Sequence, residues 1–383
     1  MRFSDKNVWQ RIKLNEYADF LQGLTYSPNN VSTTGRLVLR SSNIQNSKLA
    51  FDDNVYVNMN IPAKISTKEN DVLMCVRNGS KNLVGKTALI TKEFENLAWG
   101  AFMNIIRPKD GKTLLFHFLN SQYFKNQIKA DLNTATVNQI TIGTLNQCKI
   151  SIPLSEIEKD KLCIFFNLLD QRIDTQSKII EDLQTLKISI CDKVFEDTTY
   201  PEYKLKDVLS ERIEKSNVNN QYEILSSTIK GLFTQKEYFD KDIASSNNIG
   251  YKIVHLYDII ISPQNLWMGN ITFNQRFTNG LVSPSYKIYI INNNFDMYYI
   301  ANMLKTKRAM YKYICSSQQG ASVVRRNLNM DDFLSLSFCI PDINKQRKIG
   351  LLLNTIDKRI DLEQTYLTKL NQQKKFLLKN MFI

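Results

Sequence analysis

The feature that most constrains the fold of this chain is an internal repeat. "LDQRIDTQSKIIEDLQTL" begins at Leu169, and the similar "IDKRIDLEQTYLTKLNQQ" begins at Ile356. The same offset separates Asp71 in "NDVLMCVRNGS" from Asp258 in "YDIIISPQNLW", and almost the same offset separates the prolines that end "KISIP" and "LSFCIP". Weak matches that share one offset predict a tandem duplication of roughly 185 residues.

Each copy begins with a region of mixed secondary structure. Short β-rich runs such as "DVLMCV", "KTALI", "MNIIRP", "YDIIIS" and "YKIYII" alternate with turns rich in Asn, Gly and Ser. Two stretches, "TLLFHFLNSQYFKNQIKA" and "NFDMYYIANMLKTKRAMYKYI", favour helices between them. The pattern predicts one compact α/β (α+β) globular domain in each copy, over residues 1–153 and 201–341.

Each copy ends in a stripe of apolar residues at steps of three, four and seven, without an internal proline. This periodicity predicts one long helix over residues 154–200 and another over 342–383, each of ~40 residues and about 60 Å. A helix with one apolar stripe needs a partner, and we expect the two to pair antiparallel as a coiled coil. The predicted pairing residues are Leu162, Phe166, Leu169, Ile173, Ile180, Leu183, Ile349, Leu353, Ile356, Ile360, Leu367 and Leu370.

The charge balance points to a polyanionic partner. The net charge is +13, with a pI near 9.3. Residues 155–195 carry eight acids and six bases, and residues 342–383 carry four acids and nine bases. The opposite skew is compatible with helix pairing, and most of the excess charge lies in the globular regions. A generic basic surface is the alternative.

Other classes of protein are disfavoured by what the sequence lacks. Six scattered cysteines without a C-x-x-C pair and only two histidines make a zinc site improbable. No signal core and no apolar run of membrane-spanning length is present, so we expect a cytoplasmic protein. There is no G-x-G-x-x-G, H-E-x-x-H or [N/D]-P-P-[Y/F] motif, so we expect no catalysis and no cofactor on this chain.

One stretch, "VRNGSKNLVGKTALI", is close to a phosphate-binding loop. That loop requires four residues between its glycines and a helix after its Gly-Lys-Thr. Here Gly79 and Gly85 enclose five residues, and "KTALITKEF" is typical of a strand. A nucleotide hydrolase that uses Gly85, Lys86 and Thr87 stays open as an alternative.

The same loop suits DNA better. Arg and Lys recognise guanine edges, and Asn and Gln recognise adenine edges. Such donors gather here, at the repeat counterpart "SPQNLWMGN", which also holds Asn270, and in "NTATVNQ" and "GASVVRRN" before each long helix. The candidate DNA-binding residues are Arg77, Asn78, Lys81, Asn82, Lys86, Asn138, Gln139, Gln264, Asn265, Trp267, Arg325 and Arg326. Solvated polar loops on a non-catalytic coiled-coil scaffold are the remaining alternative.

Two similar modules predict a divided DNA target, with one short sequence for each and a gap fixed by the helices. Equivalent faces would meet the duplex about one turn apart, ~34–36 Å.

The chain resembles the specificity (S) subunits of type I restriction–modification systems over essentially its whole length. The resemblance rests on "MRFSDKNVWQRIKLNEYADFLQG", on "NGLVSPSYKIYII" and on the two Ile-Pro and long-helix units. It implies that the globular regions are target-recognition domains for a bipartite double-stranded DNA sequence. It also implies docking of two methyltransferase subunits and of restriction subunits, which would hold S-adenosylmethionine, ATP and Mg. The two recognition domains share little sequence, and "SPQNLWMG" has no arginine where the first copy has Arg77, so the resemblance does not fix individual contacts.

Overall fold

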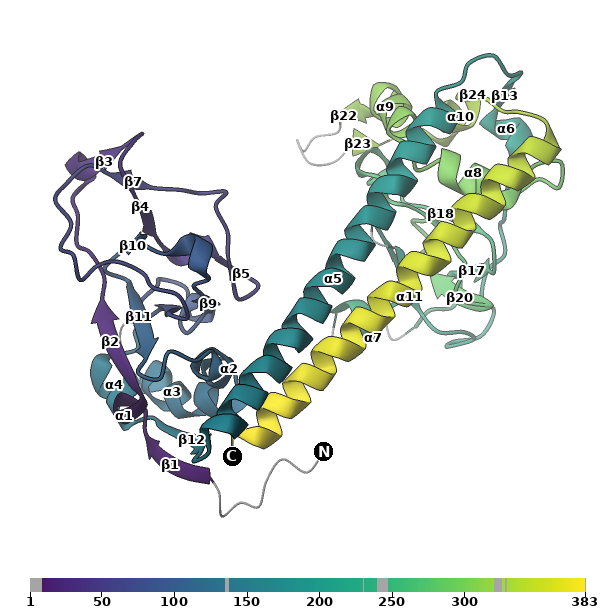
Figure 1. The fold of residues 1–383 in the computed structure, drawn as a ribbon. Coiled ribbons are helices and arrows are strands. Elements are labelled where there is room, and N and C mark those ends of the chain that lie inside the picture. Colours follow the sequence, from purple (N-terminus) through teal and green to yellow (C-terminus); the bar gives the residue numbers. More distant parts are fainter. Residues whose placement is uncertain are drawn as a thin grey trace. The chain divides into compact units, whose positions relative to one another are not determined.

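The fold is that of a computed structural model, shown in Figure 1. It describes residues 9–134, 138–229, 231–239, 247–319, 326–327 and 329–382. The chain forms two compact units, one of Met1–Ser177 with Tyr366–Ile383 and the other of Lys178–Thr365. In the described part, no helix is long and apolar enough to cross a membrane.

The globular part of the first unit contains twelve described strands and four α-helices. In chain order these are β1 (Trp9–Lys13), α1 (Leu14–Tyr17), β2 (Ala18–Gln22), β3 (Val31–Ser32), β4 (Arg36–Leu39), β5 (Ile44–Gln45), β6 (Lys48–Leu49), β7 (Tyr56–Val57), β8 (Val72–Cys75), β9 (Thr87–Leu89), β10 (Ala98–Trp99), β11 (Met103–Pro108), α2 (Leu114–Leu119), α3 (Gln122–Thr134), α4 (Ile142–Gln147) and β12 (Lys149–Pro153).

The central sheet of this unit has the order β2-β11-β8-β9 and is antiparallel throughout. Its middle strand β8 is buried on both faces. Successive side chains point to opposite sides of the sheet, and a core covers each side. Val72 and Met74 join a core with residues of α2, α3 and the long helices, whereas Leu73 and Cys75 join a core with β4 and β10. Burial on both sides accounts for the continuous apolar run "DVLMCV".

The globular part of the second unit has these described elements: β13 (Glu202–Lys204), α6 (Leu205–Val208), β14 (Leu209–Glu211), β15 (Leu225–Thr228), β16 (Gly231–Thr234), α7 (Gln235–Phe239), β17 (Lys252–His255), β18 (Ile259–Ile261), β19 (Ile271–Phe273), β20 (Asn279–Val282), β21 (Lys287–Ile291), α8 (Met297–Met303), α9 (Lys307–Ser316), β22 (Gln318–Gln319), β23 (Arg326–Asn327), α10 (Met330–Ser335) and β24 (Ser337–Cys339).

Its central sheet repeats that of the first unit, with the order β14-β21-β18-β19 and antiparallel pairing. The middle strand β18 again serves two cores, because Ile259 and Ile261 lie in one and Ile260 in the other. The tandem repeat predicted from sequence is therefore a repeat of structure.

The turn before each middle strand is also repeated. The carboxylates of Asp71 and Asp258 each accept a backbone N–H from three residues earlier, at 2.7 and 2.8 Å. The residue before each aspartate has a positive φ, 66° and 71°. An arginine neutralises each carboxylate, Arg107 at 2.7 Å and Arg212 at 2.8 Å. A buried carboxylate requires such pairing, so this turn accounts for the match between the two aspartates in the sequence repeat.

The two long helices are α5 (Glu156–Phe195) and α11 (Ile343–Met381), of 40 and 39 residues. Each begins in one compact unit and ends in the other. The prediction of two long helices after the Ile-Pro pairs is confirmed. The predicted domain boundaries stay predictions, since the compact units divide the chain within both helices.

Ion pairs between the helices follow the repeat. In the first unit, Lys374 of α11 pairs with Asp170 of α5. In the second unit the roles are exchanged, and Lys187 of α5 pairs with Asp357 of α11 at 2.6 Å. The offset of the sequence repeat also separates Asp170 from Asp357 and Lys187 from Lys374. Because the α11 partner number falls as the α5 number rises, the helices are antiparallel.

The predicted pairing residues face inward on both helices. Leu162, Phe166, Leu169, Ile180, Leu353, Ile356, Ile360 and Leu370 are buried, and Ile173, Leu183, Ile349 and Leu367 are half-buried. Several of them do more than join the helices. Leu162, Phe166 and Leu370 share one core with Leu114 and Phe118 of α2, so the stripe also holds the first globular region in place.

Candidate nucleic-acid interface

The loop between β8 and β9 (residues 76–86) lies against the segment that precedes α4. Ile140 donates its backbone N–H to the carbonyl of Val76 at 2.8 Å, and Asn78 donates its own to the carbonyl of Asn138 at 3.2 Å. Arg77 and Gln139 form an isolated antiparallel bridge between these contacts. The two candidate clusters of the first copy, which are far apart in sequence, therefore form one surface.

Two of the candidate side chains shape this loop. The Asn138 amide donates to the Gly79 carbonyl at 3.0 Å, and the Asn78 amide donates to Ser41 Oγ at 3.1 Å. The Asn78 side-chain oxygen accepts the backbone N–H of Ser80 at 2.9 Å. These bonds hold the loop in one conformation. They also use the amide donors that readout of bases would require, so Asn78 and Asn138 are better suited to positioning the loop than to contacting bases.

Arg77 presents its charge to solvent over an aromatic ring. Its guanidinium carbon lies 5.2 Å from the Phe102 ring centroid, and Phe102 is 57% exposed. The Phe102 carbonyl accepts the backbone N–H of Arg77 at 3.2 Å, so the two residues are fixed to each other. Sequence reasoning missed Phe102, because an aromatic residue in "WGAFMN" gives no sign that it is exposed. It also missed Arg40 and Ser41, which line a cavity of about 580 Å³ together with Phe102.

Gly85 fixes where the loop ends. Its φ of +86° is unfavourable for other residues, and a Cβ there would lie 3.3 Å from the Ile128 side chain of α3. Thr87 then begins β9 and is buried, so the Gly-Lys-Thr sequence opens a strand. The predicted strand is confirmed. A nucleotide-hydrolase loop needs a helix directly after its Gly-Lys-Thr sequence, and this chain has the strand β9 there.

The remaining candidates of this loop, Lys81, Asn82 and Lys86, are exposed. All three line a cavity of about 590 Å³ with α3 and the β5–β6 hairpin. Lys81 and Asn82 lie in a short 3₁₀ helix, η4 (Lys81–Leu83).

The second unit places its counterpart loop in the same way. Its 3₁₀ helix η6 (Leu266–Met268) ends at Gly269, whose φ is +90° and whose Cβ would lie 3.5 Å from Met310 of α9. Gln264 is exposed, and Asn265 and Trp267 are half-buried.

Asn270, also noted at this loop, is buried. It accepts from the Ser227 hydroxyl at 3.0 Å and donates to the Ser227 carbonyl at 3.1 Å, so its role is structural.

The last two candidates are not characterised by the structure. Arg325 lies outside the described residues, and Arg326 lies in β23, of which only the backbone is described.

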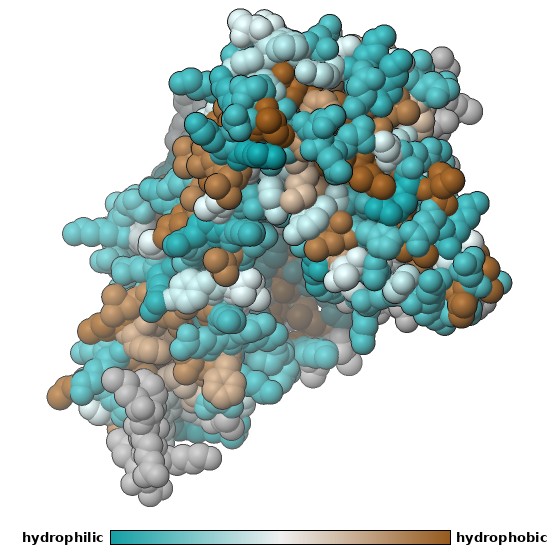
Figure 2. Space-filling model, turned by 90° about the vertical axis from the view of Figure 1, so that its right-hand side faces the viewer, coloured by the Kyte–Doolittle hydropathy of each residue, from teal (hydrophilic) through white to brown (hydrophobic). Residues whose placement is uncertain are grey.

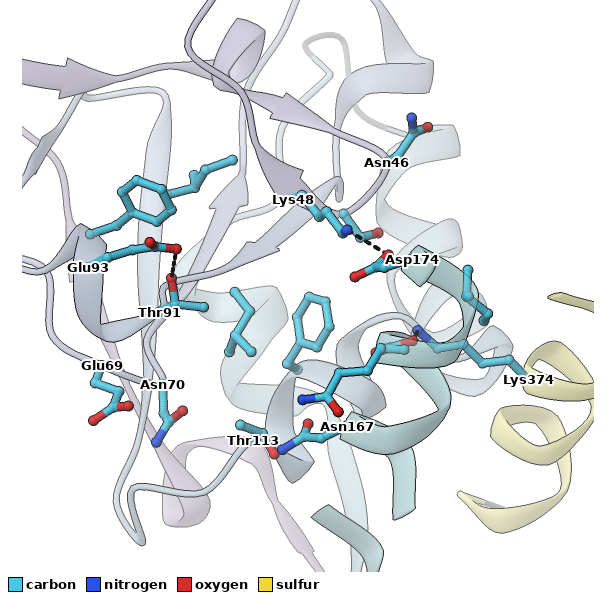
Figure 3. Close-up of a pocket in the computed structure, with 18 of the residues that line it drawn as sticks. Asn46, Lys48, Glu69, Asn70, Thr91, Glu93, Thr113, Asn167, Asp174 and Lys374 are labelled. Carbon is cyan, nitrogen blue, oxygen red and sulfur yellow. Dashed lines mark hydrogen bonds and ion pairs between the residues drawn. The ribbon is translucent and has the colours of Figure 1, made fainter. Parts of the chain in front are cut away.

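A third cavity of the first unit, of about 800 Å³, lies between the β5–β6 hairpin and the long helices (Figure 3). Lys48 of the hairpin reaches Asp174 of α5 at 2.5 Å, and Lys374 of α11 is paired with Asp170. Both lysines of this cavity are therefore paired with carboxylates. In the described residues, no group of three or more His, Cys, Asp or Glu side chains could hold a metal ion.

Comparison with known proteins decides the family. A model described as "Type I restriction modification DNA specificity domain" matches twice in tandem, at residues 7–185 and 199–372. The chain belongs to the type I restriction–modification specificity family. This confirms the resemblance read from the sequence.

Curated relatives agree with the family. The chain is 27% identical over 190 residues to the StySPI specificity subunit of Salmonella potsdam and 28% identical over 193 residues to the EcoKI specificity subunit of Escherichia coli K12. Each match covers 47% of this chain and only 40% of the relative. A putative specificity subunit, MjaX of Methanocaldococcus jannaschii, is 23% identical, with 97% of this chain and 92% of that protein covered.

Solved structures share the fold. The S subunit from M. genitalium superposes with a TM-score of 0.63 at 14% identity, covering 100% of this chain and 98% of that one. A chain from a study of assembly and conformational transition of the type I R-M system gives a TM-score of 0.54 at 14% identity, covering 97% of this chain and 96% of that one. The predicted fold class, two similar α/β domains and two long antiparallel helices, is confirmed.

Proposed function

We propose that this chain is the DNA-recognition subunit of a type I restriction–modification complex and reads a bipartite target, one half-site with each globular region. The observation that carries the proposal is the specificity domain matched twice in tandem. The structure supports it, because each copy presents a polar loop after its middle strand, braced on one helix through a left-handed glycine.

The exposed side chains of these loops have the chemistry of groove readout. Arg77 offers a forked donor suited to guanine, and Gln264 offers an amide suited to adenine. Both are exposed at corresponding loops of the two copies. The net charge of +13 would supply the sequence-independent attraction to the DNA backbone.

The long helices would dock the partner subunits. Ile157, Ile164 and Leu168 of α5 are exposed at a spacing of seven and four, which places them on one helical face. Leu351, Leu362 and Phe376 of α11 also share a face by their spacing and are exposed. Figure 2 shows apolar residues dispersed among hydrophilic ones on one face of the molecule.

Under this proposal the partners are two methyltransferase subunits and restriction subunits. They, and not this non-catalytic chain, would hold S-adenosylmethionine, ATP and Mg.

Co-expression of the chain with methyltransferase subunits of a type I system, followed by genome-wide mapping of methylated adenines, tests the proposal. We expect a two-part motif with a fixed gap, absent when the chain is omitted. A contiguous motif would contradict the bipartite reading, and methylation independent of the chain would favour the scaffold alternative.

Substitution of single loop residues tests which half-site each unit reads. Arg77→Ala should relax one half of the motif, at a cost of ~1–3 kcal/mol if its contact is bidentate. Gln264→Ala, the reciprocal control in the second unit, should relax the other half. Uniform weakening on all sequences would assign Arg77 to the phosphate backbone.

A further inference from the structure

We propose that a lysine-lined cavity in the first unit binds the phosphodiester backbone of DNA and holds the β8–β9 loop against the bases. The inference rests on the proposed function and assigns a second group of residues to it. The cavity, of about 590 Å³, is lined by Lys81 and Lys86 of the loop and by Lys125 and Lys129 of α3. The α3 lysines lie well beyond the loop in sequence and were not among the sequence candidates.

The cavity is built on a fixed frame. Lys125 and Lys129 are four positions apart, so they project from the same face of α3. Between them in sequence, Ile128 is buried and contacts the position of Gly85. Because the loop rests on that side chain, the loop lysines and the α3 lysines are held at one opening without an anion present.

The described walls of this cavity carry no acidic side chain beside Lys86, Lys125 and Lys129. Within the described part of the chain, the Lys86, Lys125 and Lys129 ammonium groups make no ion pair. Like charges at this spacing on a helix destabilise it by a few tenths of a kcal/mol, about 0.2–0.5. The arrangement is therefore unfavourable until a polyanion occupies the cavity.

The corresponding helix of the second unit uses its cations differently. On α9, Lys307 pairs with Asp192 at 3.7 Å, Arg308 donates to the Phe195 carbonyl at 3.3 Å, and Lys312 donates to the Ser337 carbonyl. Both helices brace a loop, but the cations of α9 have partners in the protein, whereas the α3 lysines have none among the described residues. Among the described residues, unpaired lysines on this helix are therefore a feature of the first unit and not of the second.

Lysine fits the backbone better than it fits bases. Its ammonium is a compact point charge that lacks the planar fork of arginine, and contacts to phosphates carry no sequence information. The cavity adjoins the surface formed by Arg77 and Asn138, since the same loop contributes to both. A DNA strand bound to these lysines would bring its neighbouring bases toward Arg77. The cavity would then position the DNA, and the β8–β9 loop would distinguish one base from another.

The salt dependence of binding tests the proposal with the full chain and a generic duplex, since phosphate contacts need no target sequence. The slope of log K against log salt should become shallower by about 1.8 in the Lys125→Gln/Lys129→Gln variant, because each phosphate that is no longer neutralised changes it by about 0.9. Lys64→Gln/Lys92→Gln removes two other exposed lysines of the same unit and should leave the slope unchanged. An unchanged slope in the cavity variant would overturn the proposal.

Lysine acetylation of the unsubstituted chain provides a measurement that misfolding cannot imitate. Duplex DNA should slow acetylation of Lys86, Lys125 and Lys129 severalfold, and leave Lys64 and Lys92 unaffected. Equal protection everywhere, or none at the cavity, would contradict the proposal. A two-part methylation motif together with an unprotected cavity would sink this inference alone, whereas absence of any motif would sink the proposed function.

Discussion

Side chains of the β8–β9 loop divide according to the partners that the fold already gives them. The amide of Asn78 is bonded to Ser41 and that of Asn138 to Gly79, whereas Arg77 keeps its guanidinium exposed over Phe102. All three were equivalent donors in the sequence. Which donor stays available depends on what lies across the loop, and Ser41 and Phe102 are remote or unmarked in sequence.

His117 should make the first unit sensitive to acid. It is buried, stacks on Phe166 at 4.7 Å and lies 3.3 Å from the Asn167 side chain. Burial, assisted by the charge of Lys374, lowers its pKa from 6.5 to about 3. Between these two pKa values the unfolded chain binds a proton that the folded chain does not. The free energy of unfolding therefore decreases as the pH is lowered below ~6.5, by up to about 1.4 kcal/mol per pH unit.

The His117→Gln variant should therefore lose less stability than the unsubstituted chain between pH 7 and 5, as urea unfolding midpoints would measure. His255→Gln, which changes the only other histidine in the chain, is measured alongside to separate the contribution of His117 from that of the other imidazole. Identical pH profiles for the unsubstituted chain and His117→Gln would refute this assignment.

At the scale of elements, the long helices are held by more than their apolar seam. The pairs Asp170–Lys374 and Lys187–Asp357 join equivalent positions of the two repeats with the roles exchanged. Both are largely shielded from solvent, with side-chain exposures between 19 and 30%. Because a shift of either helix by one turn would separate both pairs, they favour a single register.

A double-mutant cycle tests this contribution. Lys187→Met and Asp357→Asn, alone and together, should give a coupling free energy of unfolding of about 1 kcal/mol or more. The more exposed pair Lys48–Asp174, at 59 and 44% exposure, should give a smaller value, in the range of ~0.2–1 kcal/mol. Equal coupling free energies for the two pairs would mean that the Lys187–Asp357 pair contributes no more to the register of the helices than an exposed ion pair does.

Elements were more predictable than sites. The strands "DVLMCV" and "KTALI" and the two long helices follow from local periodicity, which the structure preserves. The repeat was visible because each copy contains the same turn, and that turn requires a buried aspartate that accepts a backbone N–H. Asp71 and Asp258 are these two aspartates. Lys125 and Lys129 could not be foreseen as loop neighbours, since only the packing of Ile128 against Gly85 brings α3 there.

At the scale of the whole molecule, two units of one architecture are connected through both long helices. α5 leaves the first unit after Ser177, and α11 re-enters it at Tyr366. A change in helix length at these two points would lengthen or shorten the connection between the units. It would leave both candidate loops unchanged, because their residues lie elsewhere in the chain. The spacing between half-sites and the identity of each half-site should therefore be separable properties.

Insertion of seven residues after Ser177 and of seven before Tyr366 would test that separation. Seven residues preserve the seam, since they complete almost two turns, and lengthen each helix by about 10.5 Å. The gap in the methylation motif should then grow by about three base pairs, at ~3.4 Å each, with both half-sites unchanged. Insertions of three residues, which turn the seam away from its partner, should abolish specific methylation. Altered bases within either half-site would show that the helices help to form the recognition surfaces and do not only set their spacing.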